Sequence, residues 1–269
     1  METPHVLGLI AGSGAYPLSV ARAARQRGVQ KIVAAAFTGE TDEVVTQLVD
    51  EVHWLRVGQL AKLLSAFRGS GVTHAMMTGQ IAPQNLFNLR PDWKALLLLA
   101  RLKRRNAETI FGAIADELHA AGIELLPATT FLEEFLASSG VITGRELKRS
   151  ELDDVAFGLE IAKEMSRLDV GQTVVVKGGT VLAVEAFEGT NEAIKRGGVL
   201  AGKAAVVVKV AKPNQDMRFD VPVIGTATIR VAAQAHVRVI AVEAGRTLLL
   251  ERDELLRLAR EKNITIVGC

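Results

Sequence analysis

Short apolar runs alternate with segments of helical spacing in the first half of the chain. Val6–Ala11 is an apolar run that ends at Gly12-Ser13-Gly14, and Ala15–Arg27 follows with helical spacing and stops at Gly28. Lys31–Phe37 is the next apolar run. The pattern then predicts strands and helices in turn, at Val52–Leu55, Leu60–Phe67, Thr73–Met77, Asp92–Leu102, Glu108–Ala121 and Ile123–Leu126. Such alternation is typical of a parallel sheet with helices on its faces.

The second half of the chain predicts another unit of strands and helices. Residues 138–149 are small and polar, and we interpret them as a linker. Ser150 and Asp153 form a capping-box pattern for a helix that extends to Leu168. Gly178-Gly179 joins two apolar runs, which is typical of a β-hairpin because glycine tolerates positive φ at both turn positions. The predicted elements are Thr173–Lys177, Thr180–Val184, a helix from Thr190, Ala204–Ala211, Gly225–Ala235, Val237–Val242, Asp253–Glu261 and Ile264–Val267.

The expected fold class is therefore α/β, with two α/β domains joined by a linker. Residues 1–137 form an N-terminal Rossmann-like domain with a parallel sheet, and residues 150–269 form a C-terminal mixed α/β domain. Of the 269 residues 49% are hydrophobic but only 4% are aromatic, so the core must be aliphatic. The single cysteine, Cys269, excludes an internal disulfide and a cysteine-based zinc site.

Charge and hydropathy argue against nucleic acid as a partner and against secretion or a membrane span. The chain has 32 Lys and Arg against 30 Asp and Glu, so its net charge of +2 gives no signal for nucleic acid. Met1–His5 lacks the basic residues of a secretory signal, and the apolar run Ala95–Ala100 is too short to span a bilayer. We expect a soluble, cytoplasmic protein that binds no nucleic acid.

The densest group of polar side chains lies between Pro213 and Pro222. This segment, NQDMRFDV, follows the apolar run Ala204–Ala211 and precedes the predicted helix Gly225–Ala235. Polar loops between a buried strand and a helix N-terminus are where open α/β sheets bind ligands, and exposed helix N–H groups favour anions such as phosphate. The alternative is a loop that is polar only because solvent covers it. Arg218 with carboxylates on both sides favours the ligand site.

The turn Gly12-Ser13-Gly14 is half of a dinucleotide-binding fingerprint. Pro17 stands at the position of the third glycine, and Phe37 stands where an acidic residue would bind the ribose. The pattern therefore disfavours a nicotinamide coenzyme, and the turn either binds another phosphate or is a tight connection. The five histidines show no metal-binding spacing, so a metal here would be Mg²⁺ or Mn²⁺ with oxygen ligands.

Two other polar segments have alternative interpretations. Lys177–Thr180 and Glu185–Asn191 contain phosphate-binding residue types, yet Thr190 is equally explained as a helix cap. Trp93–Arg105 combines an aromatic residue and a leucine run with the four cations Arg101, Lys103, Arg104 and Arg105, which suits an anionic membrane surface. A helix that buries its leucines in the first domain is the competing interpretation, and the pattern favours it.

Several long segments resemble the LpxI-type UDP-2,3-diacylglucosamine pyrophosphatases of lipid A biosynthesis. The resemblance covers most of the chain and is carried by LGLIAGSGAYP (Leu7–Pro17), TGQIAP (Thr78–Pro83), SRLDVGQTVVVKGGTVLAVEAFEGT (Ser166–Thr190), KPNQDMRFDVPVIG (Lys212–Gly225) and VEAGRTLLLERDEL (Val242–Leu255). Tyr16 stands where leucine is common in the family, and Phe219 stands where a smaller apolar residue occurs. Neither departure is expected to affect the chemistry.

The resemblance implies a substrate, a reaction and a catalytic domain at residues 150–269. The lipid nucleotide is held between two domains and cleaved, with a divalent metal, to UMP and 2,3-diacylglucosamine 1-phosphate (lipid X), with water directed at the phosphorus on the sugar side. The essential aspartate of the family corresponds to Asp220. We predict Asp220 and Arg218 as catalytic residues and Asp220, Glu188 and Asp216 as ligands of Mg²⁺ or Mn²⁺. The predicted substrate-binding residues are Gly12, Ser13, Gly14, Gln80, Lys177, Gly189, Thr190, Lys212, Gln215 and Thr226.

Three alternatives stay open from the sequence. One is a nucleotide- or phospholigand-binding regulatory module without catalysis, and another is a nucleotide-dependent oxidoreductase, which Pro17 and Phe37 weaken. Turnover of the lipid nucleotide with Mg²⁺ distinguishes the hydrolase from the regulatory module, and absence of NAD(P) binding would remove the oxidoreductase. The third alternative concerns assembly and location: a homodimer and a transient, peripheral contact with the inner membrane are both compatible with the sequence.

Overall fold

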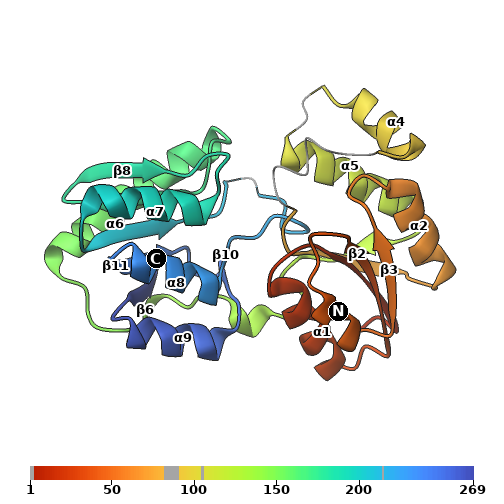
Figure 1. The fold of residues 1–269 in the computed structure, drawn as a ribbon, viewed down its shortest axis with the longest axis horizontal. Coiled ribbons are helices and arrows are strands. Elements are labelled where there is room, and N and C mark those ends of the chain that lie inside the picture. Colours follow the sequence, from red (N-terminus) through yellow and green to blue (C-terminus); the bar gives the residue numbers. More distant parts are fainter. Residues whose placement is uncertain (1–2, 82–90, 104–105, 214) are drawn as a thin grey trace. The chain divides into compact units, whose positions relative to one another are not determined.

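The computed structural model describes residues 3–81, 91–103, 106–213 and 215–269, which form two compact units (Figure 1). Unit 1 comprises Met1–Leu132 together with Asp216–Asp220, and unit 2 comprises Glu133–Gln215 together with Val221–Cys269. The predicted architecture of two α/β domains is confirmed. The five residues Asp216–Asp220 pack with unit 1, although the chain on both sides of them belongs to unit 2.

Unit 1 is a five-stranded parallel sheet with the strand order β3-β2-β1-β4-β5. Its strands are β1 (Val6–Ala11), β2 (Lys31–Phe37), β3 (Glu51–Leu55), β4 (His74–Thr78) and β5 (Glu124–Leu125). Its helices are α1 (Tyr16–Gln26), the 3₁₀ helix η1 (Glu43–Gln47), α2 (Leu60–Gly69), α4 (Trp93–Arg101) and α5 (Ala107–Ala120). The strand order reverses between β1 and β4, and open α/β sheets bind ligands at the carboxyl ends of the strands beside such a reversal.

The core of unit 1 is aliphatic, as the composition predicts. Alternate residues of β2 and β4 face one side of the sheet, where side chains of α2, α4 and α5 cover them. Leu63 and Phe67 of α2, Leu98 of α4 and Leu118 of α5 are buried in this cluster. Helix α1 packs against β1 and β4. The apolar side chains packed along the strands therefore fix the sheet, and most of its polar side chains lie at the ends of the strands.

Unit 2 is a six-stranded mixed sheet with the strand order β6-β13-β11-β9-β7-β8. Its strands are β6 (Gly140–Thr143), β7 (Thr173–Lys177), β8 (Thr180–Val184), β9 (Ala205–Lys209), β11 (Val237–Val242) and β13 (Thr265–Gly268), and β10 (Val223–Ile224) pairs separately with β12 (Leu248–Leu249). The helices are η2 (Glu133–Phe135), α6 (Arg149–Arg167), α7 (Thr190–Ala201), α8 (Thr226–Gln234) and α9 (Arg252–Glu261).

Each face of the unit 2 sheet has its own layer of helices. Val174 and Val176 of β7 pack in a cluster with Val155 and Ala162 of α6. Val175, which alternates with them, lies in a second cluster with residues of α7, α8 and α9. The hairpin predicted at Gly178-Gly179 is confirmed, since β7 and β8 are antiparallel and both glycines have positive φ.

Residues 138–149, interpreted from the sequence as a linker, contain part of this sheet. Strand β6 pairs antiparallel with β13, and a Cβ on Gly268 would lie 1.9 Å from the Ser138 carbonyl oxygen. The β-branched residues in this stretch suit an edge strand. The predicted capping pair of Ser150 and Asp153 was wrong: α6 begins at Arg149, and Glu151 accepts a hydrogen bond from the Lys148 amide at 2.8 Å.

Candidate active site

The carboxyl ends of β1 and β4 are joined by backbone hydrogen bonds at the point where the strand order reverses. The Gly12 amide donates to the Thr78 carbonyl at 2.7 Å. The Ser13 amide donates to the Gln80 carbonyl at 2.7 Å, and the Gln80 amide donates to the Ser13 carbonyl at 3.2 Å. The Ser13 hydroxyl also donates to the Gln80 carbonyl, at 2.9 Å. The structure thus brings together four of the predicted residues, Gly12, Ser13, Gly14 and Gln80.

This crossing requires glycine at two positions. A Cβ on Gly12 would lie 2.5 Å from the Gln80 carbonyl oxygen, and a Cβ on Gly79 would lie 2.5 Å from the Ser13 carbonyl oxygen. Gly79 also has a φ of +81°. Gly79 was not among the predicted site residues, although a glycine directly after strand β4 was an available signal. Gly14 is different, because its φ is +88° and nothing lies within 4 Å of its Cβ position.

Asp216–Asp220 forms a tight turn that orders its own charged side chains. The Phe219 and Asp220 amides donate to the Asp216 carbonyl at 3.2 and 3.0 Å. The Arg218 guanidinium donates two hydrogen bonds to the Asp216 carboxylate, from Nε to Oδ1 at 3.0 Å and from Nη2 to Oδ2 at 2.7 Å. These hydrogen bonds lower the pKa of Asp216 and raise the pKa of Arg218. Asp220, at the end of the turn, is half-buried.

The turn lies at the same edge of unit 1 as the β1–β4 crossing. The Ala128 amide, just beyond β5, donates to the Met217 carbonyl at 2.7 Å. The Ala128 carbonyl accepts a hydrogen bond from the hydroxyl of Tyr16, the first residue of α1. Tyr16 is only two residues from Gly14, so one residue, Ala128, connects the two predicted parts. We call Gly12–Gly14, Gln80 and Asp216–Asp220 together the unit 1 edge site.

The corresponding edge of unit 2 contains buried charges. Lys209, 5% exposed at the end of β9, donates through Nζ to Thr190 Oγ1 and to the Val223 carbonyl, both at 3.0 Å. Thr190 in turn donates to Glu185 Oε1 at 2.8 Å. Glu185 is 8% exposed, and its Oε2 has no hydrogen-bond partner among the residues that the structure describes. Lys209, the lone charged residue in the run Ala204–Ala211, was not among the predicted site residues.

Predicted Lys177 lies away from Gly189 and Thr190. Its Nζ donates to the carbonyl of Ala201 at 2.7 Å, at the C-terminal end of α7. Gly189 and Thr190 lie at the N-terminal end of the same 12-residue helix, roughly 17 Å away at 1.5 Å per residue. Lys177 therefore stabilises a helix end, where a cation is favourable.

The other predicted binding residues of unit 2 make local hydrogen bonds. Lys212 Nζ forms an ion pair with Asp169 at 2.5 Å, and the Lys212 amide donates to Gln215 Oε1 at 2.9 Å. Gln215 Nε2 is buried without a hydrogen-bond partner among the described residues. Thr226, the first residue of α8, donates to Glu251 at 2.8 Å.

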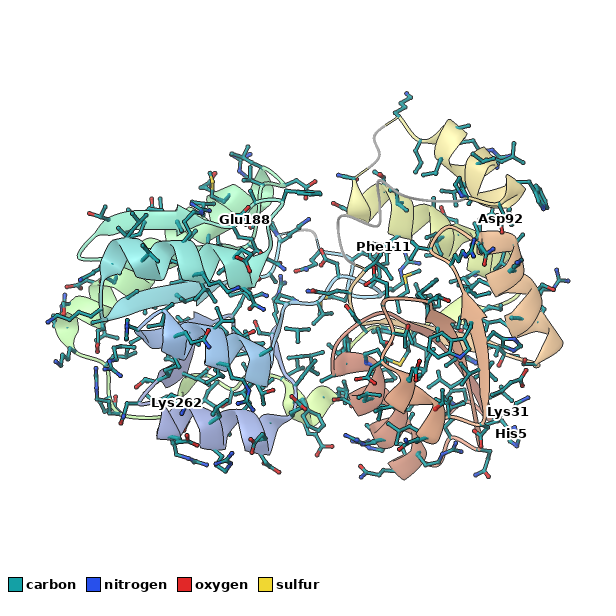
Figure 2. The ribbon with its side chains drawn as sticks, viewed as in Figure 1. His5, Lys31, Asp92, Phe111, Glu188 and Lys262 are labelled. Atoms are coloured by element: carbon teal, nitrogen blue, oxygen red, sulfur yellow. The ribbon has the colours of Figure 1, made fainter. Side chains whose placement is uncertain are left out.

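The three predicted metal ligands do not form one carboxylate cluster. Both oxygens of Asp216 bind Arg218. Glu188 is in unit 2, where its Oε1 is 2.5 Å from Arg196 (Glu188 is labelled in Figure 2). Its own backbone N–H and then Arg196 lower the pKa of Glu188. Across the described residues no group of three or more His, Cys, Asp or Glu could hold a metal. Asp220 and Asp216 belong to unit 1, whereas Glu188 belongs to unit 2.

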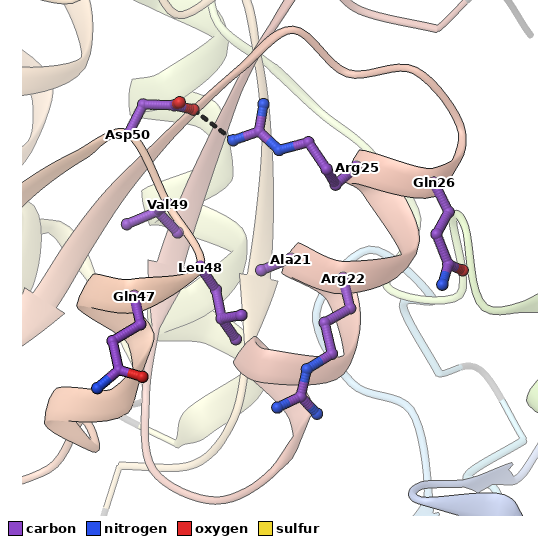
Figure 3. Close-up of a pocket in the computed structure, with 8 residues that line it drawn as sticks. All are labelled: Ala21, Arg22, Arg25, Gln26, Gln47, Leu48, Val49 and Asp50. Carbon is purple, nitrogen blue, oxygen red and sulfur yellow. Dashed lines mark hydrogen bonds and ion pairs between the residues drawn. The ribbon is translucent and has the colours of Figure 1, made fainter.

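A surface hollow of about 510 Å³ lies at the opposite edge of the unit 1 sheet (Figure 3). Arg25 of α1 and Asp50, just before β3, form an ion pair at 2.6 Å across it. The guanidinium also donates to the Val29 and Gln30 carbonyls at 3.1 and 2.6 Å, before β2 begins. The hollow is therefore at the amino ends of the strands, and none of the predicted site residues lines it.

Known families and proteins match the chain over most of its length. The family model described as LpxI N-terminal domain matches residues 6–135, and the one described as LpxI C-terminal domain matches residues 138–267. The UDP-2,3-diacylglucosamine pyrophosphatase LpxI of Caulobacter vibrioides is 30% identical over 273 residues, which cover 97% of this chain and 96% of that protein.

Solved structures give only distant similarity. The biotin carboxylase domain of Hydrogenobacter thermophilus 2-oxoglutarate carboxylase is 12% identical with a TM-score of 0.29, over 67% of this chain and 36% of that chain. Rhizobium etli pyruvate carboxylase is 14% identical with a TM-score of 0.30, over 75% of this chain and 18% of that chain. The chain spans little more than a third of the first and less than a fifth of the second, and scores this low carry no argument about function.

Proposed function

The chain belongs to the LpxI family, and from this premise we propose that it hydrolyses the pyrophosphate bond of UDP-2,3-diacylglucosamine in lipid A biosynthesis. Its products are UMP and 2,3-diacylglucosamine 1-phosphate. The observation that carries the proposal is similarity along almost the whole length of the Caulobacter pyrophosphatase. The location of the Asp220 turn at the strand-order reversal of unit 1 agrees with it, because ligands bind there in open α/β sheets.

Hydrolysis requires an oriented water and neutralised phosphoryl charge. The water oxygen bonds to the phosphorus on the sugar side, the bond from that phosphorus to the bridging oxygen breaks, and the bridging oxygen leaves with UMP. We assign Asp220 to orient the attacking water. Arg218, which Asp216 holds in a fixed geometry, supplies positive charge to the phosphoryl oxygens. Because the β1–β4 crossing uses the Gly12 and Ser13 amides, we assign contact with the substrate phosphates to Gly14, which is exposed beside them.

A divalent cation, Mg²⁺ or Mn²⁺, is part of the proposal. The predicted set of Asp220, Glu188 and Asp216 does not fit it as a cage of protein ligands, because Arg218 and Arg196 engage two of the carboxylates. One carboxylate suits Mg²⁺, which commonly binds one or two carboxylates together with substrate phosphates and water. When bound, the cation neutralises charge on the pyrophosphate. Asp220 would hold it jointly with the substrate.

Release of UMP from UDP-2,3-diacylglucosamine tests the activity. We expect turnover by the wild-type chain with Mg²⁺, loss of turnover with EDTA and recovery when Mg²⁺ or Mn²⁺ is added back. Turnover that persists in EDTA would show that the enzyme hydrolyses its substrate without a divalent cation. Binding of the substrate without any UMP release would support the regulatory module instead.

Helix α4 supports a second, finer proposal, contact with a membrane surface. The predicted leucine run is divided between core and solvent, since Leu98 is buried but Trp93, Leu96 and Leu97 are 65%, 54% and 50% exposed. The three exposed residues lie at i, i+3 and i+4, on one face of the helix. Arg101 and Lys103, which follow them, are exposed, and Arg104 and Arg105 lie outside the described residues. An apolar face next to cations suits an anionic bilayer.

Co-sedimentation with anionic lipid vesicles at low salt tests this contact. We expect Trp93→Ser/Leu97→Ser to bind vesicles more weakly than wild type. Val199→Ser/Leu200→Ser is the matched control, since these residues of α7 are also exposed and apolar. Equal binding by wild type and the α4 variant would contradict the membrane role and leave α4 as a solvated helix. None of the helices in the described ranges combines the length and hydrophobicity that crossing a membrane requires.

A further inference from the structure

The Asp220 turn is held on unit 1 by two side chains from distant parts of the chain. We propose that Tyr16 and Phe111 are positioning residues, which fix the turn Asp216–Asp220 and so set the place of the Asp220 carboxylate at the unit 1 edge site. This inference deepens the proposed hydrolase function and rests on it. Neither residue is assigned to the reacting atoms; each acts through the turn.

Tyr16 acts through the backbone of Ala128. Its hydroxyl donates to the Ala128 carbonyl, and the amide of the same residue donates to the Met217 carbonyl at 2.7 Å. Tyr16 is buried, and burial raises the pKa of its hydroxyl, so it remains a hydrogen-bond donor across the physiological range. Both hydrogen bonds are made by the backbone of Ala128, so the tyrosine fixes the segment that donates to the turn.

Phe111 acts through Phe219. The two rings have their centroids 5.9 Å apart at an interplanar angle of 46°, a tilted arrangement typical of favourable aromatic pairs (Phe111 is labelled in Figure 2). Phe219 also packs against the hydrophobic cluster that contains α5 residues. Because Phe219 directly precedes Asp220, their Cα atoms are about 3.8 Å apart. Movement of the Phe219 ring therefore moves the Asp220 backbone.

A charge on α5 acts on the same turn. Asp116 lies five residues after Phe111 on that helix, and its charge adds to that of Asp216 in raising the pKa of Arg218. The turn thus meets unit 1 through a backbone hydrogen bond, a ring contact and an attraction between charges. The chain on both sides of it belongs to unit 2. Contacts of this kind matter because a catalytic group displaced by about 1 Å can lose roughly 100-fold in rate.

Tyr16→Phe and Phe111→Leu test the proposal, with Phe157→Leu as the matched control. Tyr16→Phe removes one oxygen and keeps the ring. Phe157 is a partly buried phenylalanine of α6 that packs in the unit 2 core. We expect both test variants to lower kcat for UMP release at least tenfold and to change KM less than twofold. We expect Phe157→Leu to stay within about twofold of wild type in kcat after correction for the folded fraction.

Two further measurements separate positioning from general loss of structure. Phe219→Leu combined with Phe111→Leu should lower kcat no further than either single change, because both remove the same contact. Hydrogen exchange at the Ala128 amide, measured without substrate, should speed up in Tyr16→Phe while amides of the unit 2 core keep their wild-type rates. Wild-type kcat in folded Tyr16→Phe and Phe111→Leu, or losses that add in the double variant, would overturn the proposal. Absence of UMP release by wild type would overturn the proposed function instead. The exchange measurement would still show whether Tyr16 fixes the Ala128 segment that binds the turn.

Discussion

The two units differ in the residues that lie at the carboxyl ends of their strands. In unit 1 the edge is built from glycines and backbone groups, and Gly14, Gly79 and Gln80 are exposed. In unit 2 the edge is built from Lys209 and Glu185, which are buried and bridged by Thr190. An exposed edge beside the N-terminus of α1 suits an anionic ligand, whereas buried paired charges fix the local structure at a desolvation cost.

From this difference we expect the proposed chemistry to take place at unit 1. The turn that carries Asp220 comes from the C-terminal half of the sequence but packs at the exposed edge of unit 1. The N-terminal unit is therefore part of the catalytic machinery in this account, and the C-terminal unit supplies the chain that reaches it. Four variants or conditions test the comparison, and we give them in order of expected effect.

The largest effect should come from Asp220→Asn. The change keeps the shape of the side chain and removes its charge, so we expect kcat for UMP release to fall more than about 100-fold, a loss above roughly 2.7 kcal/mol in transition-state stabilisation. Asp153→Asn, an exposed carboxylate of α6, is the control and should keep wild-type kcat. If Asp220→Asn retains more than about a tenth of the activity, the catalytic assignment of Asp220 fails.

Gly79→Ala should be the most destabilising change at the unit 1 edge. Its positive φ and the close Ser13 carbonyl oxygen together predict a loss of about 2–4 kcal/mol in the free energy of unfolding of unit 1. Gly14→Ala is the matched comparison, because it has the positive φ but open space, and should cost about 1 kcal/mol. Urea unfolding measures both. Equal losses would show that the β1–β4 crossing is looser than the backbone distances indicate.

Lys209→Met should destabilise unit 2 by about 1–3 kcal/mol. The substitution keeps most of the side-chain volume but removes the donor to Thr190 Oγ1 and to the Val223 carbonyl. Glu185 then remains as a buried carboxylate, so adding Glu185→Gln should restore part of the loss. Urea unfolding of the single and double variants measures this. A double variant that is less stable than the single one would refute the account of a charge network.

The smallest effect concerns the Asp216–Arg218 pair. The folded state lowers the pKa of Asp216, so the pair contributes stability above the unfolded pKa of about 4 and loses it as the pH falls through the lowered value. Both side chains are partly exposed, so the contribution is below about 1 kcal/mol. Wild type should therefore lose slightly more stability than Asp216→Asn between pH 5 and roughly pH 2. Identical curves would show that the pair adds nothing to the turn.

Much of the fold could be predicted because its signals are local. The apolar runs Val6–Ala11 and Lys31–Phe37 coincide with β1 and β2, and the glycine pair marks the β7–β8 hairpin. Strand β6 was missed because it has four residues in a small, polar context. The start of α6 was misplaced because Ser150 is a favoured capping residue, whereas the helix begins at Arg149 and the Glu151 carboxylate accepts from the Lys148 amide.

The site was only partly predictable because its assembly is not local. Gly12, Ser13, Gly14 and Asp220 follow from sequence motifs. Nothing in the sequence of the turn shows that it packs on Tyr16, Phe111 and Ala128, which lie nearly 90 or more positions away. Tyr16 and Phe219, the two departures from the family pattern, were expected to be neutral. In the structure Tyr16 and Phe219 both belong to the contacts that hold the Asp220 turn on unit 1.

Hydrogen exchange with and without UMP tests the central claim most directly. If the unit 1 edge site binds the substrate phosphates, the product should slow exchange at backbone amides of Ser13, Gly14 and Asp220, while amides near Lys209 in β9 keep their rates. Protection confined to Glu185–Thr190 and the end of β9, with unchanged exchange at the unit 1 edge, would contradict the account and move the ligand site to unit 2.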